Sequence, residues 1–241
     1  MATRRHGGPA GDFRGPVDTV TYCKWKDTFV VKGKPGKRKK KTTSEKVIQH
    51  NTIFGMVNRF FKSATDTINL GYQRPKVAKI TPYNAAVSYH FDHAVIADSD
   101  AIGIDLSKVR FTFPIRQTQS AWNAVLSLED GNKVTIQWEL NPFPQKCTQL
   151  DDKVHFVFYD TESGVFDLLP DSVERSDMSF TETYLSGWGG HDLHWWMFLK
   201  SADGKLVSET EYLGMVSIVK EDTSDSNNED GKARLSKKGG A

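Results

Sequence analysis

The sequence lacks the features that mark membrane and secreted proteins. No run approaches the roughly 18 consecutive apolar residues that a membrane-spanning helix needs. No apolar stretch follows the basic residues at the N-terminus, as it would in a secretory signal. Only two cysteines occur, Cys23 and Cys147, and neither sits in a C-x-x-C motif. We therefore expect a cytoplasmic protein with no membrane association, two reduced thiols and no cysteine-based zinc site.

Catalytic signatures are also missing. The chain contains no G-x-S-x-G, no Walker A phosphate loop and no H-E-x-x-H. Two histidine pairs have i, i+3 spacing, His90/His93 and His191/His194, but nothing in the sequence completes either set to the three or four ligands that a metal needs. We expect no catalytic residue, no cofactor and no metal, so the sequence predicts a protein that is not an enzyme.

The charges that are present are unevenly distributed. The net charge of the 241 residues is only +2 at pH 7. Residues 1–60 nevertheless hold 14 basic and 4 acidic side chains, whereas the remaining 181 residues hold 18 basic and 26 acidic ones. Such asymmetry is informative about partners rather than about fold. It predicts a basic head on an acidic body.

Most of the basic residues of the head lie between positions 24 and 41. Lys and Arg side chains neutralise phosphates and release counterions, which gives affinity without sequence readout. Aromatic side chains stack on unpaired bases, and we assign Tyr22 and Trp25 to this role. The segment predicts a nucleic-acid-associated protein, or a binder of another polyanion. The residues expected to bind the polyanion are Lys24, Lys26, Lys32, Lys34, Lys37, Arg38, Lys39, Lys40 and Lys41.

Two alternatives for this segment stay open. A run of adjacent like charges also occurs in solvated loops that repel themselves and bind nothing in particular. The segment would otherwise dock against the acidic body of a neighbouring copy, since opposite charges steer head-to-tail association. In that case the protein is an oligomeric structural subunit of a virion-like particle or a filament.

The first hundred residues predict an extended arm, a hairpin and two helices. Residues 1–16 are rich in Gly, Pro and Arg and predict a flexible arm, and residues 17–32 predict a short β-hairpin with its turn near 26–27. Thr42 and Glu45 have the spacing of a capping box, and helical spacing of apolar residues continues from there to Ile68. Thr81 and Pro82 predict the start of a second helix that ends near residue 97. We group residues 17–100 as a basic hairpin plus two-helix region.

From residue 104 the apolar residues recur with period 2. About seven short strands follow, and one of them spans 109–113. This pattern predicts a mixed, mainly β protein whose residues 101–220 form an Ig-like or fibronectin-type-III-like β-sandwich, with Trp138 between the sheets. A small barrel is the alternative. Residues 221–241 are polar and predict a disordered tail.

One late strand carries a candidate partner surface. If Leu193, Trp195 and the other odd-numbered residues face the core, then Trp196 and Phe198 face outward. An exposed row of aromatic side chains usually marks a partner surface. The alternative is that the loop 184–190 or the N-terminal helices cover this row.

The order of several short motifs carries a resemblance. The motifs are Gly15-Pro16-Val17, Lys24-Trp25-Lys26, Lys34-Pro35 with the basic run, 43–54 with Gln49, Pro82-Tyr83-Asn84-Ala85-Ala86, and Ser208-x-x-Glu211-Tyr212-Leu213-Gly214. In this order, over roughly residues 11–219, the chain resembles a large family of uncharacterised proteins from Bacteroidota, classed only as a numbered domain of unknown function. It departs at His50-Asn51, where the family tends to place an Arg after the Gln. The resemblance implies a basic and helical part followed by a β-sandwich, and no activity.

Overall fold

The computed structural model describes residues 3–5, 12–25, 28–33, 44–73, 80–97, 102–169, 172–184 and 188–219. Contacts divide the chain into two compact units, residues 1–47 and 48–241. Each unit is built mainly from antiparallel β-sheet, and three α-helices are found in the described residues. No sheet formed by these residues closes into a barrel.

The first unit contains a four-stranded antiparallel sheet. The hairpin expected at 17–32 is present, because β3 and β4 pair with Trp25 opposite Thr28. Residues 1–16, which we expected to form an extended arm, contribute two further strands. The order is β1 (Thr3–Arg5), β2 (Asp12–Val17), β3 (Val20–Trp25) and β4 (Thr28–Gly33).

The strand β2 was missed because its sequence disfavours a strand. Pro16 has no N–H to donate to a ladder, and Gly15 adds conformational freedom that a strand interior loses. Gly15 adopts a φ of 111°, and Asp18 turns the chain back towards β3 with a φ of 47°. Pairing with β3 on one side and β1 on the other overrides these local preferences.

The helices begin largely where the sequence indicates but end earlier. They are α1 (Glu45–Phe60), α2 (Thr65–Gly71) and α3 (Pro82–His93). The side chain of Thr81 caps α3 by accepting a hydrogen bond from the backbone N–H of Asn84, as predicted. The single helix expected from the apolar spacing up to Ile68 is instead two helices, separated by a turn at 61–64.

A contact with a distant strand accompanies that break. The backbone N–H of Phe166 donates to the hydroxyl of Ser63, which lies in the turn. The apolar stripe faces the core before, within and after the break. Its residues Val57, Phe61, Ala64 and Ile68 are all fully buried. Helical spacing alone therefore could not reveal the turn.

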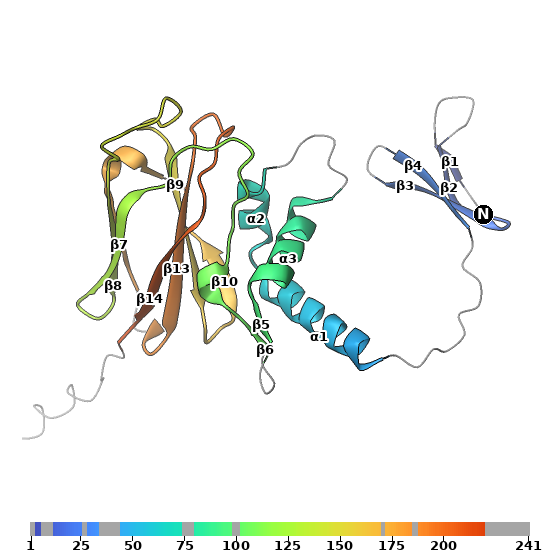
Figure 1. Ribbon diagram of the computed structural model, residues 1–241, viewed down its shortest axis with the longest axis horizontal. Helices are drawn as coiled ribbons and strands as arrows, with labels where there is room; N and C mark the ends of the chain where they lie inside the picture. Colours follow the sequence, from blue (N-terminus) through green and yellow to red (C-terminus); the bar gives the residue numbers. More distant parts are fainter. Residues whose placement is uncertain are drawn as a thin grey trace, which may run out of the picture. The chain divides into compact units, whose positions relative to one another are not determined.

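The second unit holds two larger sheets (Figure 1). One has the order β10-β9-β13-β14, with β11 pairing with β9, and the other has the order β12-β8-β7. A separate hairpin is formed by β5 and β6. The strands are β5 (Val95–Ala97), β6 (Ile102–Ile104), β7 (Trp122–Glu129), β8 (Lys133–Glu139), β9 (Lys153–Asp160), β10 (Val165–Leu168), β11 (Val173–Glu174), β12 (Ser179–Thr183), β13 (Asp192–Lys200) and β14 (Glu211–Ser217).

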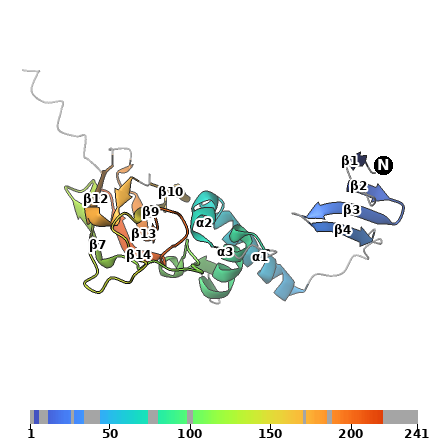
Figure 2. The ribbon, with the colours of Figure 1, turned by 90° about the horizontal axis from the view of Figure 1, so that it is seen from above.

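These sheets and the helices form three layers, as Figures 1 and 2 show from two directions. One core lies between the two sheets and contains Trp138, as predicted, packed with Phe156 and Trp195. The other core lies between the opposite face of the larger sheet and the helices, where Phe61 stacks on Phe166 of β10, which in turn packs against Trp196. The central strands β9 and β13 are therefore buried on both faces, which explains why they read as nearly continuous apolar runs.

This layering corrects the predicted partner surface. Trp196 and Phe198 are both 0% exposed and belong to the core beneath the helices. Trp196 packs edge-on against Phe111 at a centroid distance of 5.5 Å, and Phe198 stacks on His155 at 5.0 Å. The alternation was read correctly, but the outward face is covered by the N-terminal helices rather than by a partner.

The strand expected at 109–113 is also wrong. The backbone N–H groups of Phe111 and Thr112 donate to the hydroxyl of Thr210 instead of to a neighbouring strand. Gly71, at the end of α2, allows this segment to approach closely, because a Cβ there would lie 2.3 Å from the carbonyl oxygen of Phe111. In this segment a side-chain hydroxyl accepts the backbone hydrogen bonds that a neighbouring strand would accept in a β-ladder. The exception is one isolated β-bridge between Tyr72 and Phe113.

Several other expectations concern termini and thiols. Cys23 and Cys147 are both free. The capping residue Thr42 and the tail 221–241 lie outside the described residues. None of the described helices is both long enough and apolar enough to cross a lipid bilayer.

Candidate functional site

The predicted polyanion-binding segment begins on β3 and β4. Lys24 lies in β3 opposite Phe29, and Lys32 lies in β4 opposite Thr21, where it is exposed. Tyr22, predicted to stack on bases, is half-buried in β3. Trp25 occupies the last position of the same strand. The residues that lie outside the described part are Lys26, Lys34, Lys37, Arg38, Lys39, Lys40 and Lys41.

The strand register separates the two lysines that are described. Paired positions share a face of a sheet, and successive positions alternate between faces. Lys32 is paired with position 21, whereas Lys24 is an odd number of residues away from that position on β3. The register therefore assigns positions 24 and 32 to opposite faces of the sheet.

The four histidines are held by separate structural contacts. His90 is fully buried, and its Nδ1–H donates to the carbonyl of Ala86 at 2.7 Å while its Nε2 accepts from the backbone N–H of Arg110 at 2.9 Å. His93, three residues later, is exposed, and its Nδ1 donates to the carbonyl of Tyr89 at 2.9 Å. Burial is the main cause that lowers the pKa of His90 to about 4. Both ring nitrogens of His90 are occupied, so it is not available to a ligand.

The second histidine pair is likewise divided. The ring of His191 donates from Nδ1 to the carboxylate of Asp160 at 3.0 Å. His194 forms a hydrogen bond of 2.7 Å with the hydroxyl of Tyr212, on the side of the sheet that faces the helices. Desolvation lowers the pKa of His194. In the part of the chain that the structure describes, no three His, Cys, Asp or Glu side chains converge on a metal-sized space.

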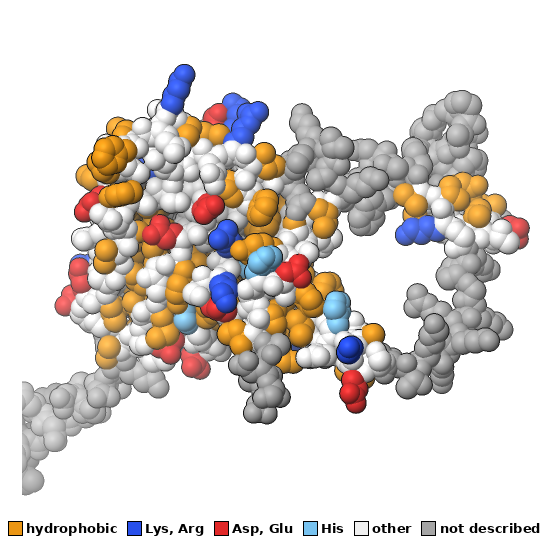
Figure 3. All heavy atoms as spheres, in the orientation of Figure 1, with side chains coloured by type: hydrophobic (Ala, Val, Ile, Leu, Met, Phe, Trp, Pro, Cys, Tyr) orange, Lys and Arg blue, Asp and Glu red, His pale blue; other side chains and the backbone are white. Residues whose placement is uncertain are grey.

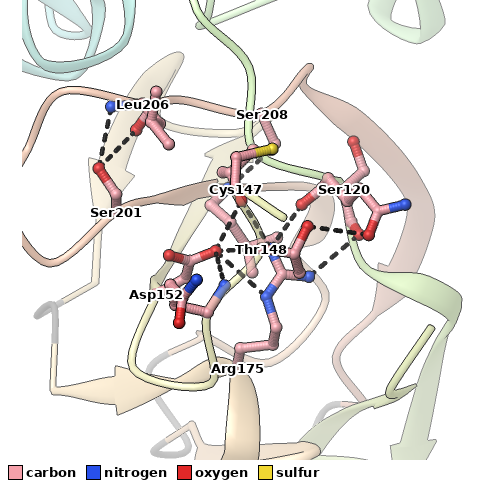
Figure 4. Close-up of polar contacts among 12 residues, drawn as sticks. Ser120, Cys147, Thr148, Asp152, Arg175, Ser201, Leu206 and Ser208 are labelled. Carbon is pink, nitrogen blue, oxygen red and sulfur yellow. Dashed lines mark hydrogen bonds and ion pairs between the residues drawn. The ribbon is translucent and has the colours of Figure 1, made fainter. Parts of the chain in front are cut away.

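A buried ion pair joins the loops at one end of the two facing sheets (Figure 4). Arg175 is 3% exposed and Asp152 is 0% exposed, and their closest atoms, Nη2 and Oδ2, are 2.9 Å apart. The guanidinium also donates to the backbone carbonyls of Gln119 and Ser120, and Thr118 donates to Asp152. The pair therefore holds the segment 118–120, which leads into β7, against the start of β9 and the end of β11. The contacts of the guanidinium and of Asp152 Oδ2 are all internal, which indicates a structural role, whereas the buried Oδ1 of Asp152 has no hydrogen-bond partner among the described residues.

An open cavity lies between α1, the segment 104–106 and the turn from β9 to β10. Its volume is about 720 Å³. Hydrophobic side chains gather over this part of the molecule in Figure 3. Most of the lining is apolar or aromatic, and the only charged side chain among the lining residues is Arg59. The lining residues are Asn51, Thr52, Gly55, Met56, Arg59, Phe60, Ile104, Leu106, Tyr159 and Gly164.

Three lining residues give the cavity its chemistry. The guanidinium of Arg59 is exposed, and no acidic side chain among the described residues pairs with it. Tyr159 is half-buried, and desolvation raises the pKa of its hydroxyl, so the phenol stays protonated at neutral pH. Phe60 packs against Tyr159 at a centroid distance of 5.1 Å and forms one apolar wall. The cavity thus combines an aromatic surface with one unpaired cation.

Sequence reasoning missed this cavity. Its wall is formed by residues of α1 that lie off the buried stripe, together with strand and loop residues more than 40 positions away. One local signal was available, because Gly55 stands in the middle of a strongly predicted helix, followed one turn later by Arg59. A glycine at such a position costs about 0.5–1 kcal/mol relative to alanine.

One known protein family matches most of this chain. A model described as a family of unknown function (DUF6266) matches residues 12–214. The chain belongs to this family. No curated protein matches it.

Several motifs of the DUF6266 resemblance have structural roles. Pro82 begins α3, and the hydroxyl of Tyr83 donates to the carbonyl of Asn58 on α1. The hydroxyl of Ser208, fully buried, accepts from the backbone of Leu199. Gly214 adopts a φ of 122° at a β-bulge between β13 and β14. In this chain these residues hold the helices and the bulge in place, and they do not point to an activity.

Proposed function

We propose that the chain is a non-enzymatic, nucleic-acid-associated protein that binds polyanions through residues 24–41. The observation that carries this proposal is the charge separation, with 14 basic against 4 acidic side chains in residues 1–60 and 18 against 26 in the rest. Five adjacent basic residues, 37–41, form its centre. Binding through them would follow counterion release and depend steeply on salt.

The β3–β4 hairpin supports this role by presenting the start of the segment. Lys32 is exposed near the end of β4, immediately before the basic run begins at Lys34. Tyr22 and Trp25 would add base stacking next to the phosphates.

The body of the protein would serve as the scaffold. We propose that its two facing sheets are an Ig-like sandwich, supported by their antiparallel pairing and by Trp138 between them. The motifs shared with uncharacterised Bacteroidota proteins support an origin in that group. Both points concern architecture and source, and the binding proposal does not depend on them.

A second candidate function follows from the same charges. The excess of acidic residues after position 60 would attract the basic segment of a neighbouring copy. The protein would then be a structural assembly subunit of a virion-like particle or a filament. This candidate differs from the first in what the basic segment contacts.

The first experiment measures fluorescence anisotropy of a labelled single-stranded DNA 20-mer against the full chain over a salt series. Replacing residues 37–41 by Gln should weaken binding and reduce the salt slope by up to about 3.5, since each lost contact to a single strand contributes about 0.7. The matched control removes the same number of charges from exposed positions of the body and should leave binding nearly intact. Its substitutions are Lys62→Gln, Lys108→Gln, Arg116→Gln, Lys146→Gln and Lys205→Gln.

The outcomes separate the two candidates. No binding at low salt, or an equal loss in the control variant, contradicts the nucleic-acid proposal. Light scattering on nucleic-acid-free protein then tests the second one. Oligomers that dissociate in salt, and that the 37–41 variant cannot form, support an assembly subunit, whereas a monomer at all concentrations contradicts it.

A further inference from the structure

We propose that the cavity between α1 and the larger sheet binds a small amphiphile that carries one carboxylate. This site is separate from the basic segment and adds a function to the one proposed above. The inference rests on three observations, namely an apolar aromatic wall, a single unpaired cation and a mid-helix glycine that leaves the cavity open.

The size and lining of the cavity fit the apolar body of such a ligand. Its volume of about 720 Å³ lies within the range of about 300–1,000 Å³ that is usual for small-molecule sites. Met56, Phe60, Leu106 and Tyr159 line it, and Ile104 completes the apolar surface. Methionine and aromatic side chains adapt to varied apolar shapes, which suits a flexible or aromatic ligand body.

Arg59 determines the charge of the ligand. It is the only charged residue in the described lining, and no acid in the described residues forms an ion pair with it. A guanidinium binds a carboxylate through two parallel hydrogen bonds. Asn51, which also lines the cavity two turns earlier on α1, brings an amide that can hydrogen-bond to a polar group elsewhere on the ligand. One cation balances one carboxylate, so a ligand with a single negative charge is favoured.

Gly55 explains how the ligand reaches the helix. A Cβ built at this position meets no atom within 4 Å, so packing within the described structure does not require a glycine. The position lines the cavity, and any side chain there would project into open space next to Arg59 one turn later. A glycine that weakens the helix without a packing reason is expected where a ligand approaches the backbone closely.

The experiment titrates the full-length protein with decanoate and with decanol by isothermal calorimetry. Decanoate should bind saturably, and decanol should bind at least about tenfold more weakly, because charge-assisted hydrogen bonds are worth that factor or more. Arg59→Gln should weaken decanoate to the level of decanol and leave decanol unchanged. Arg116→Gln, which removes an exposed arginine outside the cavity, is the matched control and should bind like the wild type.

Two variants at Gly55 separate loss of the site from loss of the fold. Gly55→Ala should melt no lower than the wild type, and Gly55→Leu should remain folded but lose decanoate and decanol together, because its side chain occupies the cavity. The variant with residues 37–41 replaced by Gln should bind decanoate normally, so failure of this site and failure of the polyanion proposal are distinguishable. The inference is overturned if decanoate does not saturate at millimolar concentration, if Arg59→Gln binds it equally well, or if Gly55→Leu leaves binding unchanged.

Discussion

The buried histidine of α3 makes the protein's stability depend on pH in a way that can be calculated. His90 is 0% exposed, donates from Nδ1 to Ala86 and accepts at Nε2 from the backbone N–H of Arg110. Protonation would turn Nε2 into a donor that faces another donor. Burial, assisted by the charges of Arg110 and His93, lowers the pKa of His90 from 6.5 to about 4.

The sign and size of the effect follow from these two pKa values. Between pH 6.5 and 4 the unfolded chain binds more protons than the folded one, so the free energy of unfolding rises with pH. The contribution of His90 is fully present above about pH 6.5 and is lost as the pH falls towards 4. Over the whole window it amounts to about 3 kcal/mol, and between pH 7 and pH 5 to about 2 kcal/mol.

Urea denaturation of the wild type and His90→Gln at pH 7 and pH 5 measures this contribution. The glutamine variant should be less stable at pH 7, and it should lose about 2 kcal/mol less than the wild type on acidification, since its side chain does not titrate. Other groups, including half-buried His194, are common to both proteins and cancel. His50→Gln replaces an exposed histidine of α1 that is not among the groups shifting the pKa of His90, and it is the matched control. Equal losses in the wild type and His90→Gln would refute the reasoning.

Three further substitutions test the packing. Gly71→Ala should cost about 1–3 kcal/mol, because its Cβ would lie 2.3 Å from the carbonyl oxygen of Phe111. Arg175→Met should cost about 3–5 kcal/mol by leaving Asp152 charged and unpaired in the interior. Trp196→Ala should also cost about 3–5 kcal/mol, as expected for a core residue rather than a surface one. Urea denaturation measures each value, and a cost below about 1 kcal/mol would contradict the corresponding contact.

The sheet strands could be predicted from the sequence because their signals are local. Period-2 alternation and the turn at 130–132 located β7 and β8, and Trp138 was correctly expected between the sheets. The same rule failed to predict the burial of Trp196, because alternation identifies the two faces of a strand but not which of them is exposed to solvent. Three helices cover the second face here, so both faces of β13 are core.

The errors near the helices have long-range causes. The turn at 61–64 contacts β10 through the hydroxyl of Ser63, and the segment around Phe111 is held by Thr210, which is about 100 residues away. Neither contact changes the spacing of apolar residues in the neighbouring sequence. The break between α1 and α2 even preserves the apolar period, so the pattern remained consistent with one continuous helix.

The two candidate binding sites differ in the same respect. The basic segment is visible in the sequence because charge is counted locally, whereas the cavity exists only where α1 meets Leu106 and Tyr159. The matched family does not distinguish them, since the motif residues that can be followed in the structure, such as Tyr83 and Gly214, hold the helices and the bulge in place. Function therefore has to be sought at positions that the fold of this chain does not need. Gly55 and Arg59 are such positions, because a Cβ at position 55 would meet no atom within 4 Å and the side chain of Arg59 is exposed.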